Sequence, residues 1–280
     1  MDYSCLIQLQ VLIQFQTLTI NYKPPKMALL FKSTISFPLN SCLDPPKSNP
    51  RNSLTMKTSV TTSIDSFSTI SVPLEKRKLP ILLFDIMDTI VRDPFYHDVP
   101  AFFGMSMKEL LECEHPTAWN EFEKGLIDED ELARKFFIDG RDFDLEGLKT
   151  CIKRGYSYLD GIEELLRALK QNNYEIHAFT NYPTWYQMIE DKLNLSNYLS
   201  WTFCSCKTGK QKPDPDFYRE ALRYLDVEPG SCIFIDDRMK NVEGAVNVGL
   251  VGLQFKGADV LRQDLSRLGV SISAHELSHK

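Results

Sequence analysis

Residues 81–93, ILLFDIMDTIVRD, constrain the fold of this chain more than any other stretch. Four consecutive apolar residues end at Asp85, and Asp88 and Thr89 follow closely behind it. A short run that is apolar throughout is typical of a strand buried on both faces, as in the middle of a parallel sheet. A carboxylate at the carboxyl end of such a strand lies where open α/β sheets bind their ligands. Asp85 could instead simply cap the next loop, and the rest of the chain decides between these two interpretations.

The composition argues against several classes of protein. With 280 residues the chain can form one large domain or a domain with an insertion. A net charge of −6 argues against a nucleic-acid binder held by bulk charge, and no apolar stretch is long enough to span a membrane. The seven cysteines do not suggest a disulfide framework, and Cys204 and Cys206 lack the second Cys/His pair of a zinc site. We therefore expect a soluble, intracellular protein with reduced cysteines.

Residues 1–77 differ from the rest of the chain. They are rich in Ser and Thr, contain few acidic residues and show no sustained apolar periodicity, so they should not fold alone. A Ser-rich, acid-poor leader is typical of an organelle transit peptide, and the excess of Ser and Thr over Arg favours the chloroplast stroma over the mitochondrion. Met27 is a possible alternative start, with residues 1–26 as an upstream extension. The alternative is a disordered linker without a targeting role.

From residue 78 onwards, apolar strands alternate with amphipathic helices. This alternation predicts an α/β fold with a doubly wound parallel sheet. The expected strands are residues 81–84, 174–179, 198–204, 232–235 and 251–255, and the expected helices between them are residues 161–170, 183–193, 215–225 and 241–248.

The stretch after the first strand is too long for a simple crossover between strands. It contains further expected helices at residues 107–113, 118–124, 129–137 and 144–154. We interpret residues 94–170 as a helical cap inserted into a core formed by residues 78–93 and 171–270, with residues 271–280 as a tail.

Polar side chains follow the predicted strands at four places. They are Asp85 with Thr89, Thr180 with Asn181, Lys212 at a helix start, and Asp236 and Asp237 with Asn241. Each alone has an ordinary structural explanation as a helix cap or a solvated turn. Because the carboxyl ends of parallel strands meet at one edge of a sheet, we expect all four to converge there.

This set of residues suggests phosphoryl transfer. The Asp85 carboxylate can attack phosphorus and form an aspartyl-phosphate, which divides hydrolysis into two easier steps. Asp85 and Asp237 together would hold Mg²⁺, a cation that prefers oxygen ligands. Lys212 would neutralise the charge of the phosphate, while the Thr180 hydroxyl and neighbouring N–H groups bind its oxygens.

Four motifs, FDIMDT, FTNYP, GKQKPDP and FIDDRMKN, resemble those of the haloacid dehalogenase (HAD) superfamily, and the resemblance covers residues 80 to about 260. It implies catalytic roles for Asp85, Lys212 and Thr180, phosphate contacts from Thr180, Asn181 and Lys212, and a Mg²⁺ site of Asp85, the Met87 backbone carbonyl, Asp237 and Asp236. Asp236 takes a place often held by Gly, and Asn241 takes that of a supporting acid. The cap is of the small helical type.

More narrowly, FDIMDTIVRDPFY, IDGRDFDLEG and SWTFCSC resemble the plant plastid members described as flavin mononucleotide hydrolases. This implies hydrolysis of flavin mononucleotide (FMN) to riboflavin and phosphate, although nothing in composition or spacing identifies a flavin. A phosphatase of another small phosphometabolite such as a sugar phosphate, a dehalogenase-type hydrolase and a non-catalytic phosphometabolite-binding protein are the alternatives. The expected partner is a small phosphate ester, not a nucleic acid or a membrane, and a homodimer is possible.

Met87 departs from the pattern of the family. Its phosphatases usually carry a second Asp two residues after the nucleophile as general acid, a role typically worth about 10²–10⁴-fold. Asp88 can supply that acid only if the chain bends after Met87, because side chains at i and i+3 of an extended segment point to opposite sides. We therefore expect a slow phosphatase, or one whose acid comes from Asp88, from the cap or from the substrate.

Substrate selection is expected from the cap and from the loop after Asp93. The aromatic side chains available there could stack on an aromatic ring, although packing of the cap core is the simpler explanation for most of them. They are Phe95, Tyr96, Phe102, Phe103 and Trp119, with Trp185 near the second motif.

Overall fold

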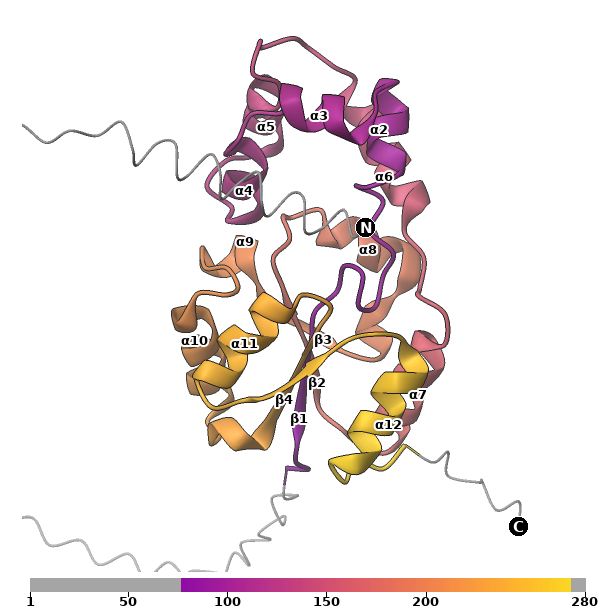
Figure 1. Cartoon of the computed structure of the whole chain (residues 1–280), viewed down its shortest axis with the longest axis vertical. Helices are drawn as coiled ribbons and strands as arrows, with labels where there is room; N and C mark the ends of the chain where they lie inside the picture. Colours follow the sequence, from indigo (N-terminus) through magenta and orange to yellow (C-terminus); the bar gives the residue numbers. More distant parts are fainter. Residues whose placement is uncertain (1–76, 273–280) are drawn as a thin grey trace, which may run out of the picture. The chain divides into compact units, whose positions relative to one another are not determined.

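The computed structural model describes residues 77–272. Residues 1–76 of the predicted transit peptide and residues 273–280 of the predicted tail lie outside this range. The described residues contain a parallel sheet of five strands in the order β3-β2-β1-β4-β5, with β1 in the middle as the sequence predicts (Figure 1). The strands are β1 (Ile81–Phe84), β2 (Ile176–Thr180), β3 (Ser200–Cys204), β4 (Cys232–Asp236) and β5 (Val251–Gln254).

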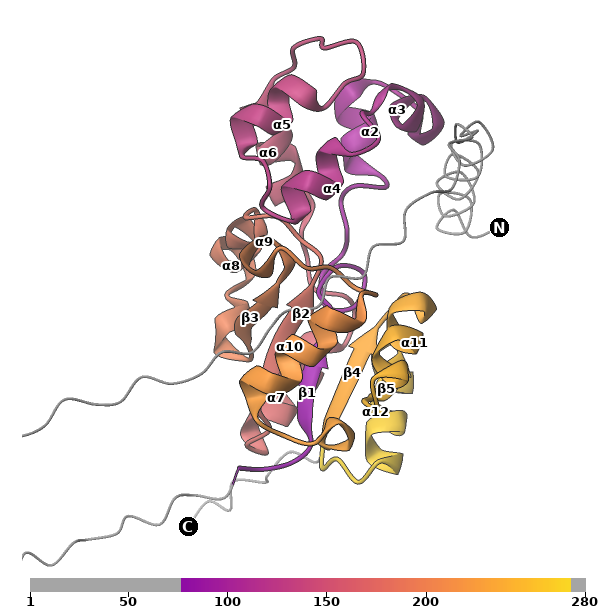
Figure 2. The ribbon, with the colours of Figure 1, turned by 90° about the vertical axis from the view of Figure 1, so that its left-hand side faces the viewer.

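Strand β1 is buried on both faces because its side chains alternate between two hydrophobic cores. Ile81 and Leu83 belong to the core under α10 and α11. Leu82 and Phe84 belong to the core on the opposite face, under α7, α8 and α12 (Figures 1 and 2). The helices concerned are α7 (Ile162–Gln171), α8 (Tyr186–Leu193), α10 (Pro215–Leu225), α11 (Met239–Asn247) and α12 (Ala258–Arg267). An unbroken apolar run is therefore what this position requires.

Five short helices form a separate layer above the carboxyl end of the sheet (Figures 1 and 2). Two of them begin with capping boxes, in which Ser106 and Glu109 start α3, and Asp128 and Glu131 start α5. The helices are α2 (Asp98–Phe103), α3 (Met107–Cys113), α4 (Ala118–Glu123), α5 (Glu129–Lys135) and α6 (Leu145–Gly155). We identify this layer with the predicted cap.

The remaining elements are short connections, namely η1 (Leu195–Asn197), α9 (Ser205–Thr208) and η2 (Pro229–Ser231). Within the described residues the cysteines are free, as expected. No helix among these elements has the length and apolar character needed to cross a lipid bilayer.

The structure differs from the sequence prediction at several boundaries. Helix α7 contacts α12 beside the sheet (Figure 1). We therefore propose that the cap ends before α7, whereas the sequence prediction placed its end at residue 170. Helix α8 begins at Tyr186 instead of Pro183, because Tyr186 and Gln187 first form tight i→i−3 bonds to Pro183 and Thr184. Helices α2 and α12 were not predicted.

The cap is docked on the core where the end of α4 meets α9. Gly125 has a φ of +66°, and a Cβ atom built there would lie 2.5 Å from the backbone oxygen of Cys206. We expect Gly125→Ala to lower the free energy of unfolding by about 1–3 kcal/mol more than Gly104→Ala. Gly104 is the matched control, because it has the same backbone conformation, φ +65°, and no atom within 4 Å of its Cβ position. Equal losses in chemical denaturation would contradict the importance of this close contact.

Candidate active site

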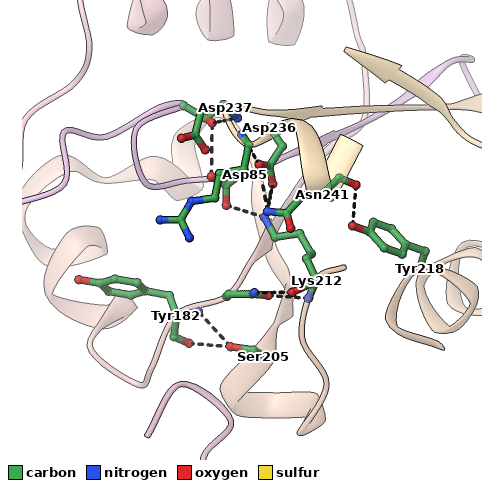
Figure 3. A network of polar contacts seen from close by, with 11 residues as sticks. Asp85, Tyr182, Ser205, Lys212, Tyr218, Asp236, Asp237 and Asn241 are labelled. Atoms are coloured by element: carbon green, nitrogen blue, oxygen red, sulfur yellow. Dashed lines mark hydrogen bonds and ion pairs between the residues drawn. The ribbon is translucent and has the colours of Figure 1, made fainter. Parts of the chain in front are cut away.

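The predicted polar clusters meet at the carboxyl edge of the sheet. Asp85 directly follows β1, Thr180 ends β2 and Asp236 ends β4. Lys212 reaches the same place from the loop before α10 (Figure 3). The expected convergence of these groups is therefore present.

Lys212 is the centre of a buried charge network. Its Nζ donates to Asp85 Oδ1 and to Asp236 Oδ2, each at 2.6 Å. The Lys212 side chain is 1% exposed and the Asp236 side chain is 0% exposed, so this pairing is shielded from solvent. Burial alone lowers the pKa of Lys212, but the carboxylates of Asp236 and Asp85 raise it above the ordinary value. The ammonium group is therefore held charged beside the expected nucleophile.

Asp236 has all of its oxygens occupied by neighbours. Besides Lys212, the Asn241 side-chain amide donates to both Asp236 oxygens at 3.1 Å, and the Arg238 backbone N–H donates to Oδ1 at 2.8 Å. Asn241 is itself fixed, because its backbone carbonyl accepts from the Tyr218 hydroxyl at 2.8 Å. Asp236 thus orients Lys212, and Asn241 acts as a donor that holds the Asp236 carboxylate.

Asp85 and Asp237 face one another across Thr89. The Thr89 hydroxyl donates to Asp85 Oδ2 at 3.3 Å and accepts from the Asp237 backbone N–H at 3.1 Å. Burial raises the pKa of Asp85 to about 6 against the lowering effect of Lys212. Burial, and then the negative charges of Asp85 and Asp236, raise the pKa of Asp237 to about 7.

These acidic groups have the chemistry of a site for a hard cation. One ligand oxygen from each of Asp85, Asp236 and Asp237 lies within 4.8 Å of the other two. Crowded carboxylates with raised pKa values are stabilised by a divalent cation, and an all-oxygen donor set suits Mg²⁺. Met87 lies opposite Val91 in a short β-bridge. The hydrogen bonds of this bridge join Val91 to the Ile86 carbonyl and to the Asp88 N–H, so they do not use the Met87 carbonyl.

Thr180 and Asn181 differ in how their side chains are used. The Thr180 hydroxyl oxygen is buried without a hydrogen-bond partner in the described part of the chain. A buried hydroxyl of this kind suits a contact with a ligand oxygen. The Asn181 side chain, by contrast, clamps the backbone of Lys212, accepting from its N–H at 2.8 Å and donating to its carbonyl at 2.9 Å. Sequence reasoning treated Asn181 as a phosphate contact and did not foresee this clamp.

A cavity of about 300 Å³ opens above these groups between core and cap. This volume is at the lower end of the range for small-molecule sites. Its polar lining includes Asp85, Asn181 and Lys212 from the core. Its aromatic lining consists of Phe95, Tyr96, Trp119 and Tyr182. Phe102, Phe103 and Trp185, which were also predicted, instead pack among other aromatic rings of the cap and its boundary.

Sequence reasoning missed a polar bridge between α4 of the cap and the loop that carries Lys212. Glu123 accepts from Trp119 Nε1 at 2.9 Å and from Gln211 Nε2 at 2.7 Å, and Asn120 donates to Gln211 Oε1 at 2.7 Å. Burial raises the pKa of Glu123 to about 7. No local motif marks these residues, because they are brought together only when the cap docks.

Ser205 joins the same two parts of the molecule. Its hydroxyl donates to the Glu123 backbone carbonyl at 2.5 Å. The same hydroxyl accepts from the Tyr182 N–H at 2.9 Å (Figure 3). The cap is thus attached to the segment directly after Thr180 and Asn181. Sequence reasoning gave Ser205 no role.

Comparisons with known proteins agree with this geometry. The chain matches the family described as haloacid dehalogenase-like hydrolase over residues 81–249. It is 69% identical over 202 residues to a chloroplast flavin mononucleotide hydrolase 1 of Arabidopsis thaliana, which covers 72% of this chain and 82% of the relative. It is 27% identical over 172 residues to a sesquiterpene phosphatase of Aspergillus oryzae, which covers 59% of this chain and 85% of that relative.

A solved structure shares the fold. It is a HAD family enzyme from Bacteroides thetaiotaomicron in complex with magnesium and inorganic phosphate, with a TM-score of 0.53 and 17% identity over 64% of this chain and 96% of that one. The family match covers more than half of the chain, and the architecture agrees with it. This chain belongs to the haloacid dehalogenase-like hydrolases.

Proposed function

We propose that this protein is a Mg²⁺-dependent phosphatase that hydrolyses FMN to riboflavin and phosphate through an aspartyl-phosphate on Asp85. The observation that carries the proposal is the buried contact of Lys212 Nζ with Asp85 Oδ1 at 2.6 Å, at the end of the strand next to the one that ends in Thr180. A cation next to a nucleophilic carboxylate, with an unpartnered hydroxyl at the end of the neighbouring strand, suits a transferring phosphoryl group.

Each residue then has a distinct task. Asp85 attacks phosphorus, Lys212 neutralises the charge that develops, and Thr180 binds a phosphate oxygen. Asn181 fixes the backbone of Lys212, so its own phosphate contact would come from the backbone N–H. Asp85, Asp237 and the Met87 carbonyl would hold Mg²⁺, which supplies Lewis-acid stabilisation of phosphoryl charge when bound. Asp236, whose oxygens are already bonded, orients Lys212.

The choice of FMN rests on the relative and on the cavity. The Arabidopsis relative, at 69% identity, is named a flavin mononucleotide hydrolase. The cavity presents Phe95, Tyr96, Trp119 and Tyr182 above the polar groups, which suits an ester with a large aromatic ring at the far end from its phosphate. Three neighbouring carboxylates favour a metal-dependent phosphatase over a dehalogenase, since dehalogenases of the family act without Mg²⁺.

The same relative supports a location in the chloroplast, because it is named as a chloroplast protein. Residues 1–77 would act as the transit peptide and residues 78–280 would remain after import. A fusion of residues 1–77 to a fluorescent protein should enter plastids of plant cells. A fusion that stays in the cytosol would contradict this assignment.

Phosphate release from a panel of esters tests the proposed activity. We expect purified protein to release phosphate from FMN faster than from sugar phosphates and nucleotides, with activity lost in EDTA and restored by Mg²⁺. Release from sugar phosphates alone would keep the mechanism and reject the flavin. Tight binding of FMN without any release would favour the non-catalytic alternative.

A further inference from the structure

Hydrolysis of FMN in this cavity needs a group that donates a proton to the leaving oxygen, and Met87 cannot supply it. In FMN the phosphate ester oxygen is attached to a sugar-alcohol carbon, so the leaving group is a strongly basic alkoxide. General acid catalysis of such a step is typically worth about 10²–10⁴-fold. Met87 lines the cavity, but its thioether carries no ionisable proton. This inference rests on the proposed phosphatase function.

Asp88, the sequence-based candidate, is used for another purpose. The chain does bend there, since Asp88 has a φ of +54°. Its Oδ1, however, accepts from the backbone N–H of Asp93 at 3.0 Å, and Asp88 is absent from the lining of the cavity. The bend therefore turns the Asp88 carboxylate onto the loop and anchors Asp93.

Asp93 faces the cavity and is held from two sides. Its backbone is fixed by Asp88, and its Oδ1 accepts from the Phe95 N–H at 2.9 Å. These two bonds leave Oδ2 of a cavity-lining carboxyl group available to a ligand. Asp93 thus lines the same cavity as Asp85. The two hydrogen bonds, from its own backbone N–H and from the Phe95 N–H, hold the loop that carries it.

Glu123 is the other carboxyl group that lines the cavity apart from Asp85. Both of its oxygens accept hydrogen bonds, from Trp119 and from Gln211. These hydrogen bonds lower the pKa of Glu123, although burial outweighs them, and they leave Glu123 no free oxygen to carry a proton to a substrate. Glu123 therefore suits the attachment of the cap better than proton transfer.

The surroundings of Asp93 raise its pKa and so extend its protonated form to higher pH. Burial, and then the charges of Asp88 and Asp85, raise the pKa of Asp93 to about 6 against the lowering effects of the Phe95 N–H and Arg238. A general acid works best with a pKa near the operating pH. The titratable and charged groups that interact with Asp93 are Asp85, Asp88, Tyr96, Glu123, Tyr156, Tyr182 and Arg238.

We propose that Asp93 is the general acid and base of this phosphatase, in place of the Asp that the family usually carries at the position of Met87. In the first step an Asp85 oxygen bonds to phosphorus, the bond from phosphorus to the ester oxygen breaks, and that oxygen takes the proton of the Asp93 carboxyl group. In the second step the Asp93 carboxylate takes a proton from water, whose oxygen bonds to phosphorus as the bond to Asp85 breaks. Phosphate leaves, and both aspartates return to their starting states.

The test compares two leaving groups in single turnovers of the Asp93→Asn variant, with enzyme in excess and Mg²⁺ present. Riboflavin formation from FMN requires the proton and should slow by about 10²–10⁴-fold. Release of 4-nitrophenolate from 4-nitrophenyl phosphate, whose leaving group departs readily as an anion, should slow by less than about 10-fold. The substituted Asn retains the oxygen that accepts from Phe95. Equal slowing of both esters, or no slowing of either, would overturn the proposal.

Two further variants sharpen the test. Glu114→Gln removes another cap carboxyl group, one whose pKa is raised to about 7 by burial but which does not line the cavity, and it should leave both rates unchanged. If Glu123→Gln, and not Asp93→Asn, slows FMN selectively, the acid is Glu123 and the proposal fails. If the wild-type protein hydrolyses no phosphate ester, the proposed function itself fails.

The wild-type protein offers a second readout that does not depend on the folding of a variant. Because Asp93 must be protonated in the first step, the single-turnover rate with FMN should fall as the pH rises above about 6. The rate with 4-nitrophenyl phosphate should not fall over the same range. Parallel pH profiles for the two esters would contradict the role of Asp93.

Discussion

Replacing Asp85 by Asn is expected to lower the rate of phosphate release from FMN by more than about 10⁴-fold, because loss of a nucleophile removes the covalent route as a whole. The amide is nearly the same size as the carboxylate, so Lys212 keeps its contact with Asp236 and the fold should persist. Steady-state assays with Mg²⁺, and thermal unfolding followed by circular dichroism, measure the two effects. Residual activity within about 10-fold of the wild-type rate would rule out Asp85 as the nucleophile.

The stability of the same variant, relative to that of the wild type, should depend on pH when no metal is bound. The pKa of Asp85 rises from 3.8 to about 6 on folding. A raised pKa gives stability that is present below pH 3.8 and is lost as the pH rises through about 6. The amide that replaces this carboxyl group does not titrate, so in EDTA the variant should gain stability relative to the wild type as the pH increases over this range. A relative loss of stability would contradict the electrostatic description of the site.

Lys212→Met should remove both activity and stability. Without the Lys212 ammonium group, the phosphoryl group loses a charged contact during its transfer. A contact of this kind is worth roughly 10²–10³-fold in rate. Asp85 and Asp236 would also remain buried without their shared partner. Removing one partner from a buried ion pair typically costs about 3–5 kcal/mol, so we expect a loss of this size in the free energy of unfolding above neutral pH. The loss should shrink at low pH as the carboxylates take up protons.

Lys210→Met provides the matched control for this variant. Lys210 lies two residues away and pairs with Glu220, but both side chains are 35% exposed. A partly exposed pair contributes within about 1 kcal/mol. Chemical denaturation of both variants at several pH values compares them directly. Similar losses for the two lysines would show that the buried network around Lys212 has no special importance.

The sequence was sufficient to predict the parallel sheet and the convergence of the polar groups at its edge. The apolar run that ends at Asp85 is typical of a strand buried on both faces, and parallel strands bring their carboxyl ends together. Pro215 and the Asp214 N-cap gave the start of α10 correctly, because both act within one turn of the chain.

The sequence was not sufficient where a role depends on contacts between distant segments. Glu123 and Gln211 are 88 residues apart, and their hydrogen bond forms only when the cap docks on the core. Asp88 and Asp93 are near one another in sequence, but the φ of +54° that turns Asp88 away from the cavity is not encoded by a Gly. The boundary of the cap is a similar case. The periodicity of α7 shows that one face of the helix is buried, but it does not specify the element against which its Leu side chains pack.

The most direct test of the account is to trap the covalent intermediate. Protein mixed with FMN and Mg²⁺ should be quenched in acid within one turnover, digested and mapped by mass spectrometry. We expect one added phosphoryl group on the peptide that contains Asp85, at Asp85 itself, and none in the Asp85→Asn variant. Turnover of FMN with the phosphoryl group on another residue, or with no phosphorylated peptide at any quench time, would contradict it.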